Sequence, residues 1–136
     1  MAIGKLNEDG ISRRPLRHGI LRTFAYAFSG LWHLLRTQRN ARIEVAIGVA
    51  AGALGAWLRI GRVEWALLTT TMALVLILEG LNTAIESAVD LAMPQQHPLA
   101  KACKDLAAGM VLVAAIAAVA VGLLILGPPL WQRLVK

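Results

Sequence analysis

Charged side chains are scarce in this sequence. Asp, Glu, Lys and Arg make up 16% of its 136 residues, against about a quarter in an ordinary soluble domain. Apolar residues account for 57%, the mean hydropathy is +0.62, and the apolar residues are bunched into long runs. This composition argues against a soluble enzyme and predicts one domain in a lipid bilayer.

Cysteine is nearly absent as well, since Cys103 is the only one. A single cysteine cannot form an intrachain disulfide, and its spacing to the histidines suggests no metal site. Residues 1–40 lack the continuous apolar core of a secretory signal peptide, so none is expected. The chain also has no P-loop, no Gly-rich kinase loop and no His-Arg-Asp catalytic loop. Any nucleotide chemistry must therefore differ from that of the familiar soluble kinases.

Positive charge is in excess, and its distribution is uneven. The formal net charge is +6, and eight of the 14 basic residues precede Ile43: Lys5, Arg13, Arg14, Arg17, Arg22, Arg36, Arg39 and Arg42. A basic flank beside apolar spans is typical of the cytoplasmic side of a membrane. Nucleic-acid binding would require interleaved stacking aromatics or a known module. Neither is present, so we expect no nucleic-acid partner.

The apolar pattern begins at Leu16, after a polar tail that we expect over residues 1–15. Apolar side chains then recur at helical spacing and predict an amphipathic surface helix over 16–38: Ile20, Phe24, Phe28, Leu31 and Leu35. Three membrane-spanning helices should follow within a single domain over 16–130, before a short tail at 131–136; their expected ranges are 43–58, 63–91 and 99–126.

Two details of these spans carry further expectations. The first span has Gly48, Gly52 and Ala56 at four-residue spacing, which favours close helix packing on that face. The third is expected to end at Leu126, because Gly127 and two prolines follow.

Basic residues also predict the orientation. The amino-terminal segment and the second loop hold ten of them, the eight above plus Lys101 and Lys104, against four on the other side. The amino terminus should therefore be cytoplasmic and the carboxyl terminus outside. Three tryptophans then fall near the outer interface, where indole rings are favoured: Trp57, Trp65 and Trp131.

The second span carries an acidic stripe, which we define as Glu79, Asn82, Glu86 and Asp90. Steps of 3, 4 and 4 residues place these side chains within about 80° of one another on one helix face. Residues 63–91 would be about 43 Å long, against a hydrocarbon core of about 30 Å, so the end of the helix should project toward the cytoplasm. Placing a carboxylate near the bilayer costs about 2 to 3 kcal/mol, which calls for a cationic partner or a chemical task.

The third span offers that partner within HPLAKACKD, where Lys101, Lys104 and Asp105 share one face. One interpretation is simple ion pairing between Lys104 and the stripe. The other is phosphoryl transfer: Mg²⁺ prefers carboxylate oxygens, a carboxylate accepts the proton of an alcohol, and lysine neutralises phosphate. A third is a non-enzymatic subunit that uses Glu79 for proton or ion conduction, which would not require the other polar residues.

The run EGLNTAIESAVDL followed by HPLAKACKDLAAG resembles the prokaryotic diacylglycerol kinase and undecaprenol kinase family, as do YAFSGLW and RNARI earlier in the chain. The resemblance covers about residues 20–126. It implies an all-α homotrimer in the bacterial inner membrane, each subunit having a surface helix and three spans, with active sites shared between subunits. It also implies ATP as co-substrate, Mg²⁺ or another divalent cation, and a membrane lipid alcohol as acceptor. HPLAK is more similar to the undecaprenol kinase branch, so undecaprenol is favoured and diacylglycerol comes next.

By this resemblance Glu79 is the catalytic base and Glu86 a metal ligand. The resemblance also implies a nucleotide site formed by Tyr26, Asn82, Glu86, Asp90, His97, Lys104 and Asp105, although His97 could equally be structural at a helix start. Gln38 departs from the family, which usually has a metal-binding glutamate there; an amide oxygen can coordinate a cation but brings no charge. Glu44 is not expected to replace it, because it lies about 120° away around a helix, and is expected near Arg42 at the membrane boundary.

Overall fold

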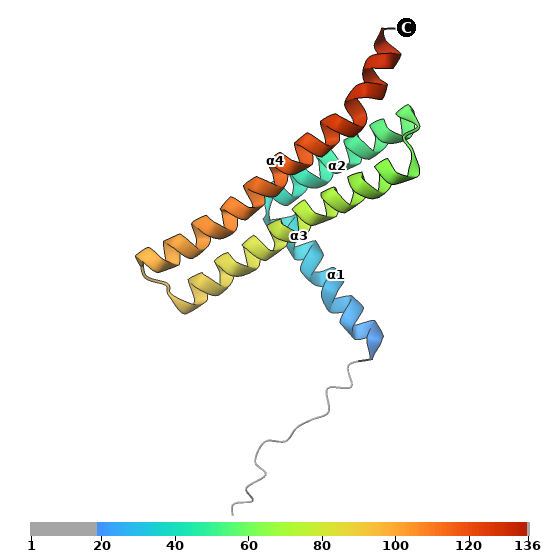
Figure 1. Ribbon diagram of the computed structural model, residues 1–136. Helices are drawn as coiled ribbons and strands as arrows, with labels where there is room; N and C mark the ends of the chain where they lie inside the picture. The colour runs from blue at the N-terminus through green and yellow to red at the C-terminus, as the bar shows by residue number, and fades with distance from the viewer. Residues whose placement is uncertain (1–18, 136) are drawn as a thin grey trace, which may run out of the picture.

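The computed structural model describes residues 19–135, except for the side chain of Leu21. Within this part of the chain there are four helices and no strand (Figure 1): α1 (Ile20–Thr37), α2 (Arg39–Leu58), α3 (Arg62–Ala92) and α4 (Pro98–Leu134). The predicted all-helical class is confirmed. The predicted polar tail and the start of the surface helix at 16–18 lie outside the described residues.

Three of these helices, α2, α3 and α4, are long and apolar enough to cross a membrane. Their most apolar windows have mean hydropathies of 1.4, 1.5 and 2.8, so α4 is the most apolar of the three. The predicted number of spans is confirmed. Helix α2 starts at Arg39, directly after Gln38, so the RNARI segment belongs to the spanning helix. The polar residues of RNARI and the apolar span therefore belong to one continuous helix.

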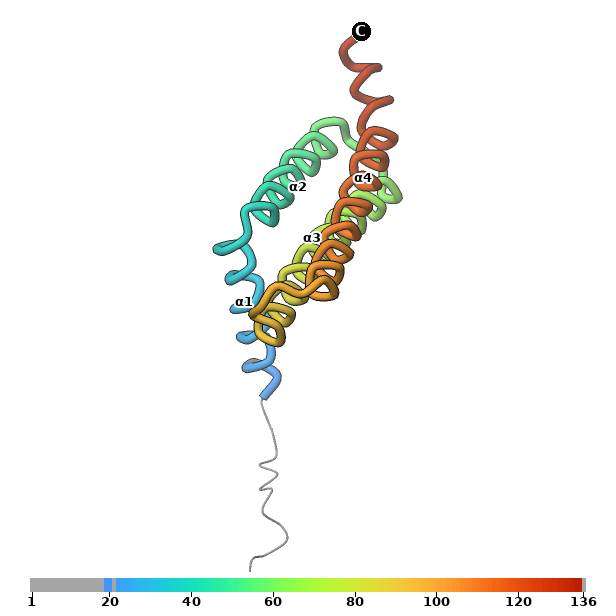
Figure 2. Tube along the Cα trace, turned by 90° about the vertical axis from the view of Figure 1, so that its left-hand side faces the viewer, coloured from blue at the N-terminus to red at the C-terminus, as the bar shows by residue number. Residues whose placement is uncertain are grey.

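The helices α3 and α4 lie side by side as an antiparallel pair along most of their length (Figures 1 and 2). Helix α2 runs beside the upper part of this pair, and α1 leaves the three long helices at an angle (Figure 1). The two parts meet where Leu34 of α1 is buried: a Cβ on Gly80 of α3 would lie 3.6 Å from the Leu34 Cδ2. The absence of a side chain at Gly80 therefore lets α1 approach the middle of α3.

Small residues on α2 form its buried seam, which includes Gly48 but neither Gly52 nor Ala56 of the series that four-residue spacing predicted. Ala41, Gly48 and Gly55 are buried at seven-residue intervals. A Cβ on Gly48 would lie 2.7 Å from the Cε of Met72 on α3, whereas one on Gly52 would meet nothing within 4 Å. The predicted packing role of Gly52 was therefore wrong for contacts within one chain, because four-residue steps drift around a helix and seven-residue steps stay on one line.

Helix α4 continues to Leu134, past the predicted end at Leu126. Pro128 and Pro129 lie inside it, and each removes one backbone hydrogen bond to the preceding turn. The end of α4 bends in Figure 1, as proline inside a helix requires. Beyond the bend, the Arg133 guanidinium carbon lies 4.8 Å from the centroid of the Trp57 ring. This cation–π contact ties the end of α4 to the end of α2.

The start of α3 provides a test of the fold. The Gly61 N–H donates a hydrogen bond to the Glu64 carboxylate, which closes the first turn of the helix. Replacing Glu64 by Ala removes this acceptor and should lower the unfolding free energy by about 0.5–2 kcal/mol. Glu64→Gln keeps an acceptor oxygen and should lose less. SDS titration of the micellar protein, followed by circular dichroism, measures both; an Ala variant as stable as the unmodified protein would contradict the capping role.

Candidate active site

The acidic stripe of α3 runs from the protein interior to an exposed helix end. Glu79 is only 2% exposed, Asn82 and Glu86 are half-buried, and Asp90 is exposed. Glu79 and Asp90 are about 16 Å apart along the helix axis. One helix face thus leads from an apolar interior to a polar surface.

The buried end of the stripe faces α2. The side chain of Asn40 lies near the Glu79 carboxylate. The carboxylates of Glu44 and Glu79 are close enough to interact electrostatically, and the Glu44 Oε2 is buried with no hydrogen-bond partner among the described residues. Two polar side chains of α2 therefore lie near Glu79.

Sequence reasoning missed Asn40 and Glu44 as members of this site. It expected Glu44 near Arg42 at the membrane boundary, and the structure adds an electrostatic interaction between Glu44 and Glu79. The available signal was their four-residue spacing in RNARIE, which places Asn40 and Glu44 on one face of α2. The spacing did not say which helix that face meets.

Asn82 lies in the middle of the stripe and is hydrogen-bonded to the next member, Glu86. Its Nδ2 donates a hydrogen bond to the Glu86 Oε1 over 3.2 Å. Its Oδ1 is buried and has no partner within the described part of the chain. Since the donor side of the amide is engaged by Glu86, the acceptor oxygen is oriented for a hydroxyl group or a cation.

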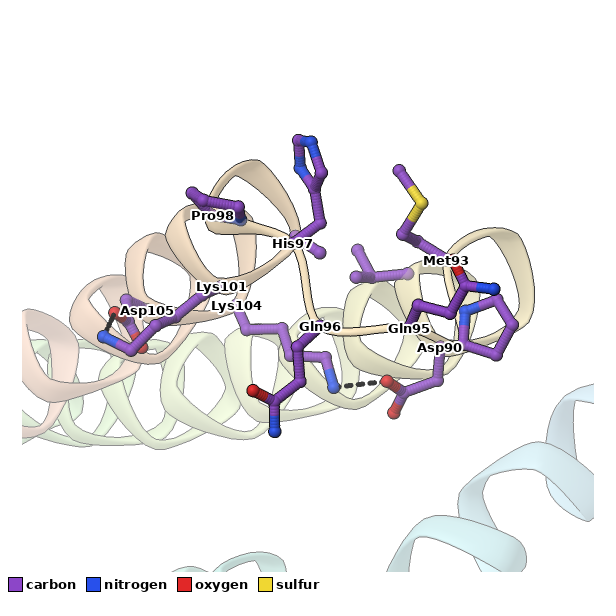
Figure 3. A pocket seen from close by; sticks show the side chains of 12 residues that line it. Asp90, Met93, Gln95, Gln96, His97, Pro98, Lys101, Lys104 and Asp105 are labelled. Atoms are coloured by element: carbon purple, nitrogen blue, oxygen red, sulfur yellow. Dashed lines mark hydrogen bonds and ion pairs between the residues drawn. The ribbon is translucent and has the colours of Figure 1, made fainter.

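At the exposed end, α3 and α4 form a hairpin around a cavity of about 770 Å³. Lys104 of α4 reaches across to form an ion pair with Asp90 of α3 (Figure 3). The Lys101 Nζ lies 2.9 Å from the Asp105 Oδ2, within α4. The expected basic face is thus divided: Lys104 joins the stripe, and Asp105 pairs with Lys101.

His97 caps the start of α4. Its Nδ1 accepts a hydrogen bond from the Leu99 N–H over 3.2 Å. The ring points away from the ion pair between Asp90 and Lys104 in Figure 3, although His97 is among the residues that line the cavity. The geometry thus gives this histidine a structural task, and its part in the nucleotide site stays a prediction.

Tyr26 and Gln38 come from outside the α3–α4 hairpin. Tyr26 is 64% exposed on α1, about two turns before the buried Leu34. Gln38 separates α1 from α2: its backbone is extended, and its N–H donates to the Leu34 carbonyl over 2.8 Å. Gln38 is half-buried. It directly precedes the first residue of α2 and lies two residues before Asn40.

The described residues contain no group of three or more His, Cys, Asp or Glu side chains that could hold a metal ion. Mg²⁺, however, commonly uses one or two carboxylates and completes its coordination with water and substrate phosphates. The half-buried Glu86, oriented by Asn82, fits that mode of binding.

The sequence is similar to those of several known proteins. Residues 25–126 match the model of the prokaryotic diacylglycerol kinase family. A diacylglycerol kinase of Synechocystis is 46% identical over 91% of this chain and 75% of its own length. An undecaprenol kinase of Bacillus subtilis is 40% identical over 90% of this chain and 99% of its own length. A diacylglycerol kinase of Escherichia coli is 32% identical over 74% of this chain and 82% of its own length.

The hairpin ion pair yields a stability test. The Asp90 side chain is 65% exposed and that of Lys104 is 34% exposed. An ion pair this open to solvent contributes at most about 1 kcal/mol, so Asp90→Asn should change the unfolding free energy by no more than that. Asp105→Asn, which breaks the exposed pair within α4, is the matched control. SDS-induced unfolding measures both, and a loss of several kcal/mol for Asp90→Asn alone would make the pair a main structural contact instead.

Proposed function

Because the chain belongs to the prokaryotic diacylglycerol kinase family, and is therefore a membrane enzyme that transfers phosphate from ATP to a lipid alcohol, we propose that it phosphorylates undecaprenol, with diacylglycerol as the second candidate. The observation that carries the proposal is the buried Glu79 at one end of the acidic stripe on α3. At the other end, Asp90 pairs with Lys104 of α4. Family membership leaves no place for the non-enzymatic, ion-conducting alternative.

Two features support undecaprenol as the acceptor. The HPLAK segment at the start of α4 is similar to that branch of the family. The relative named undecaprenol kinase aligns with this chain at 40% identity over 99% of its own length. The higher identity to a relative named diacylglycerol kinase keeps that lipid as the second candidate.

In the proposed reaction, the Glu79 carboxylate accepts the proton of the lipid hydroxyl. The hydroxyl oxygen forms a bond to the γ-phosphorus of ATP, the bond from that phosphorus to its bridging oxygen breaks, and ADP leaves. Asn40 and Glu44 of α2 lie near Glu79, and the Asn40 amide would orient the Glu79 carboxylate. Burial among apolar helices keeps bulk water from competing with the lipid for the phosphate.

The nucleotide is proposed to lie along the lower stripe, with its phosphates toward Glu79. Lys104 would exchange Asp90 for a phosphate oxygen, since an exposed ion pair costs little to break. Asn82, His97 and Asp105 would complete the polar lining, and Tyr26 would offer an aromatic face to the base. When bound, a divalent cation would be held by Glu86 and the Gln38 amide oxygen, and would neutralise phosphate charge.

We also propose a homotrimer in the bacterial inner membrane, with the amino terminus and the active site cytoplasmic. Each chain leaves large apolar side chains open, among them Leu74 at 50% and Leu81 at 52% exposure on α3, the helix that carries the site. Copies of the chain packed against α3 would cover these side chains and enclose the stripe, which one chain leaves open. The basic amino-terminal segment supports the orientation.

Turnover by a Glu79 variant tests the base. Glu79→Gln keeps the size and hydrogen bonding of the side chain but cannot accept the proton, so the rate should fall by about 10²–10⁴-fold. The measurement is phosphate transferred from ATP to organic-soluble lipid by the purified protein in micelles with undecaprenol or diacylglycerol. ATP binding should persist, and Glu64→Gln, at the other end of α3, serves as the control. Full activity of Glu79→Gln would contradict this role, and no lipid phosphate from the unmodified trimer would contradict the proposed function itself.

The departure at Gln38 has its own test. Gln38→Glu adds a negative charge where a divalent cation is proposed to bind. It should lower the Mg²⁺ concentration that gives half-maximal activity by roughly tenfold, equivalent to about 1.4 kcal/mol. Gln132→Glu adds the same charge near the far end of α4 and should leave that concentration unchanged. An unchanged Mg²⁺ requirement in Gln38→Glu would remove residue 38 from the metal site.

A further inference from the structure

A second cavity, of about 380 Å³, lies between α2, α3 and α4. We call it the inter-helix groove. Its lining is almost entirely apolar, and Glu44 is the only charged residue among the side chains that line it. The polar Thr71 in the lining donates its hydroxyl to the Leu67 carbonyl over 2.7 Å, so its polarity is satisfied within α3. Its volume lies within the range of small-molecule sites, about 300–1,000 Å³.

One end of the groove lies at Glu44, near the proposed active site. Glu44 lines its polar end and also interacts electrostatically with Glu79. From there the wall on α2 extends to Leu54, about 15 Å farther along the helix. A molecule whose polar end reaches Glu79 can therefore leave its apolar part in the groove.

The groove also opens toward the outside of the chain. Ile47, Val119 and Leu123 line it and are nevertheless 64%, 63% and 67% exposed. Side chains that both line a cavity and lie open to the outside mark its edge. A membrane lipid could therefore enter sideways from the bilayer without leaving the hydrocarbon.

The two sides of the groove differ in width. On the α2 side, the tip of Met72 lies against Gly48, where an added Cβ would be 2.7 Å from the Met72 Cε. On the α4 side, a Cβ on Gly122 would meet nothing within 4 Å. Ala115 and Ala118 precede Gly122 along the same wall. The free width of the groove is thus on the α4 side, at Gly122.

We propose that the inter-helix groove holds one hydrocarbon chain of the lipid acceptor, and that the missing side chain at Gly122 gives it the width for a methyl-branched isoprenoid chain. This inference rests on the proposed lipid kinase function. A polyisoprenoid carries a methyl group on every fourth carbon of its backbone and is wider than a straight acyl chain. One groove leading from Glu79 also suits an alcohol with one chain better than a glycerol with two.

The test compares two acceptors in variants at Gly122. The measured quantity is kcat/KM for undecaprenol divided by kcat/KM for dioleoylglycerol, in the same micelles. Gly122→Leu should lower this ratio by roughly tenfold or more, since the space of a single methylene in an apolar pocket changes selectivity by about 10–200-fold. Gly122→Ala should give a smaller decrease. Gly109→Leu, the same change on α4 at a glycine that does not line the groove, should leave the ratio unchanged.

A direct readout separates this inference from the kinase assignment. Undecaprenol carrying a photoreactive diazirine within its chain is irradiated with the Glu79→Gln trimer, and mass spectrometry locates the adducts. Adducts on Val119 or Leu123 that disappear in Gly122→Leu are expected, even if the protein phosphorylates neither lipid. An unchanged selectivity ratio in Gly122→Leu, or adducts outside the groove, would overturn the inference. Loss of the trimer in Gly122→Leu, with Gly122→Ala unaffected in its ratio, would instead assign the groove to a second copy of the chain.

Discussion

The burial of one carboxyl group constrains the rest of this structure. Glu79 is 2% exposed on a helix apolar enough to cross a membrane, where an ionisable side chain costs several kcal/mol unless its surroundings compensate. Asn40 and Glu44 meet it from α2, and the packing of Leu34 on Gly80 brings α1 against the adjacent residue. Three of the four helices thus converge at the point where the carboxyl group is buried.

The meeting of these helices also explains how one small chain can act on a lipid in hydrocarbon and a nucleotide in water. Above Glu79 the inter-helix groove is apolar, and below it the stripe becomes more exposed until Asp90 meets Lys104 at the hairpin end. A lipid hydroxyl and a nucleotide phosphate can approach the same carboxylate from opposite directions along α3. In the proposed reaction only the transferred phosphate crosses the boundary between hydrocarbon and water. The lipid chain stays in the hydrocarbon, and the nucleotide stays in water.

Much of this arrangement could be predicted from the sequence because it is local to one helix. Apolar runs predicted the three spans, and steps of 3 and 4 residues predicted that Glu79, Asn82, Glu86 and Asp90 share a face of α3. The contribution of Glu44 could not be predicted in this way. It depends on how α2 is rotated about its own axis, which the buried seam of Ala41, Gly48 and Gly55 determines by packing on its neighbours.

Local rules also failed where tertiary contacts outweigh them. Gly127 and the two prolines normally end a helix, yet α4 continues past them and Arg133 then packs on Trp57. His97 had two alternatives from sequence, and only the hydrogen bond from Leu99 shows that its ring caps α4. The expected cluster of Lys101, Lys104 and Asp105 is divided, because Lys101 pairs with Asp105 within α4 and Lys104 pairs with Asp90 across the hairpin.

The central claim is that the lipid hydroxyl meets Glu79. Solid-state NMR of the protein in bilayers can measure this contact, with undecaprenol ¹³C-labelled at its hydroxymethyl carbon and the protein labelled at its glutamate or aspartate side-chain carboxyl carbons. We expect a through-space contact in the glutamate-labelled sample that persists in Glu64→Gln and disappears in Glu79→Gln. A contact that survives Glu79→Gln, or one seen only with labelled aspartate, would contradict the account.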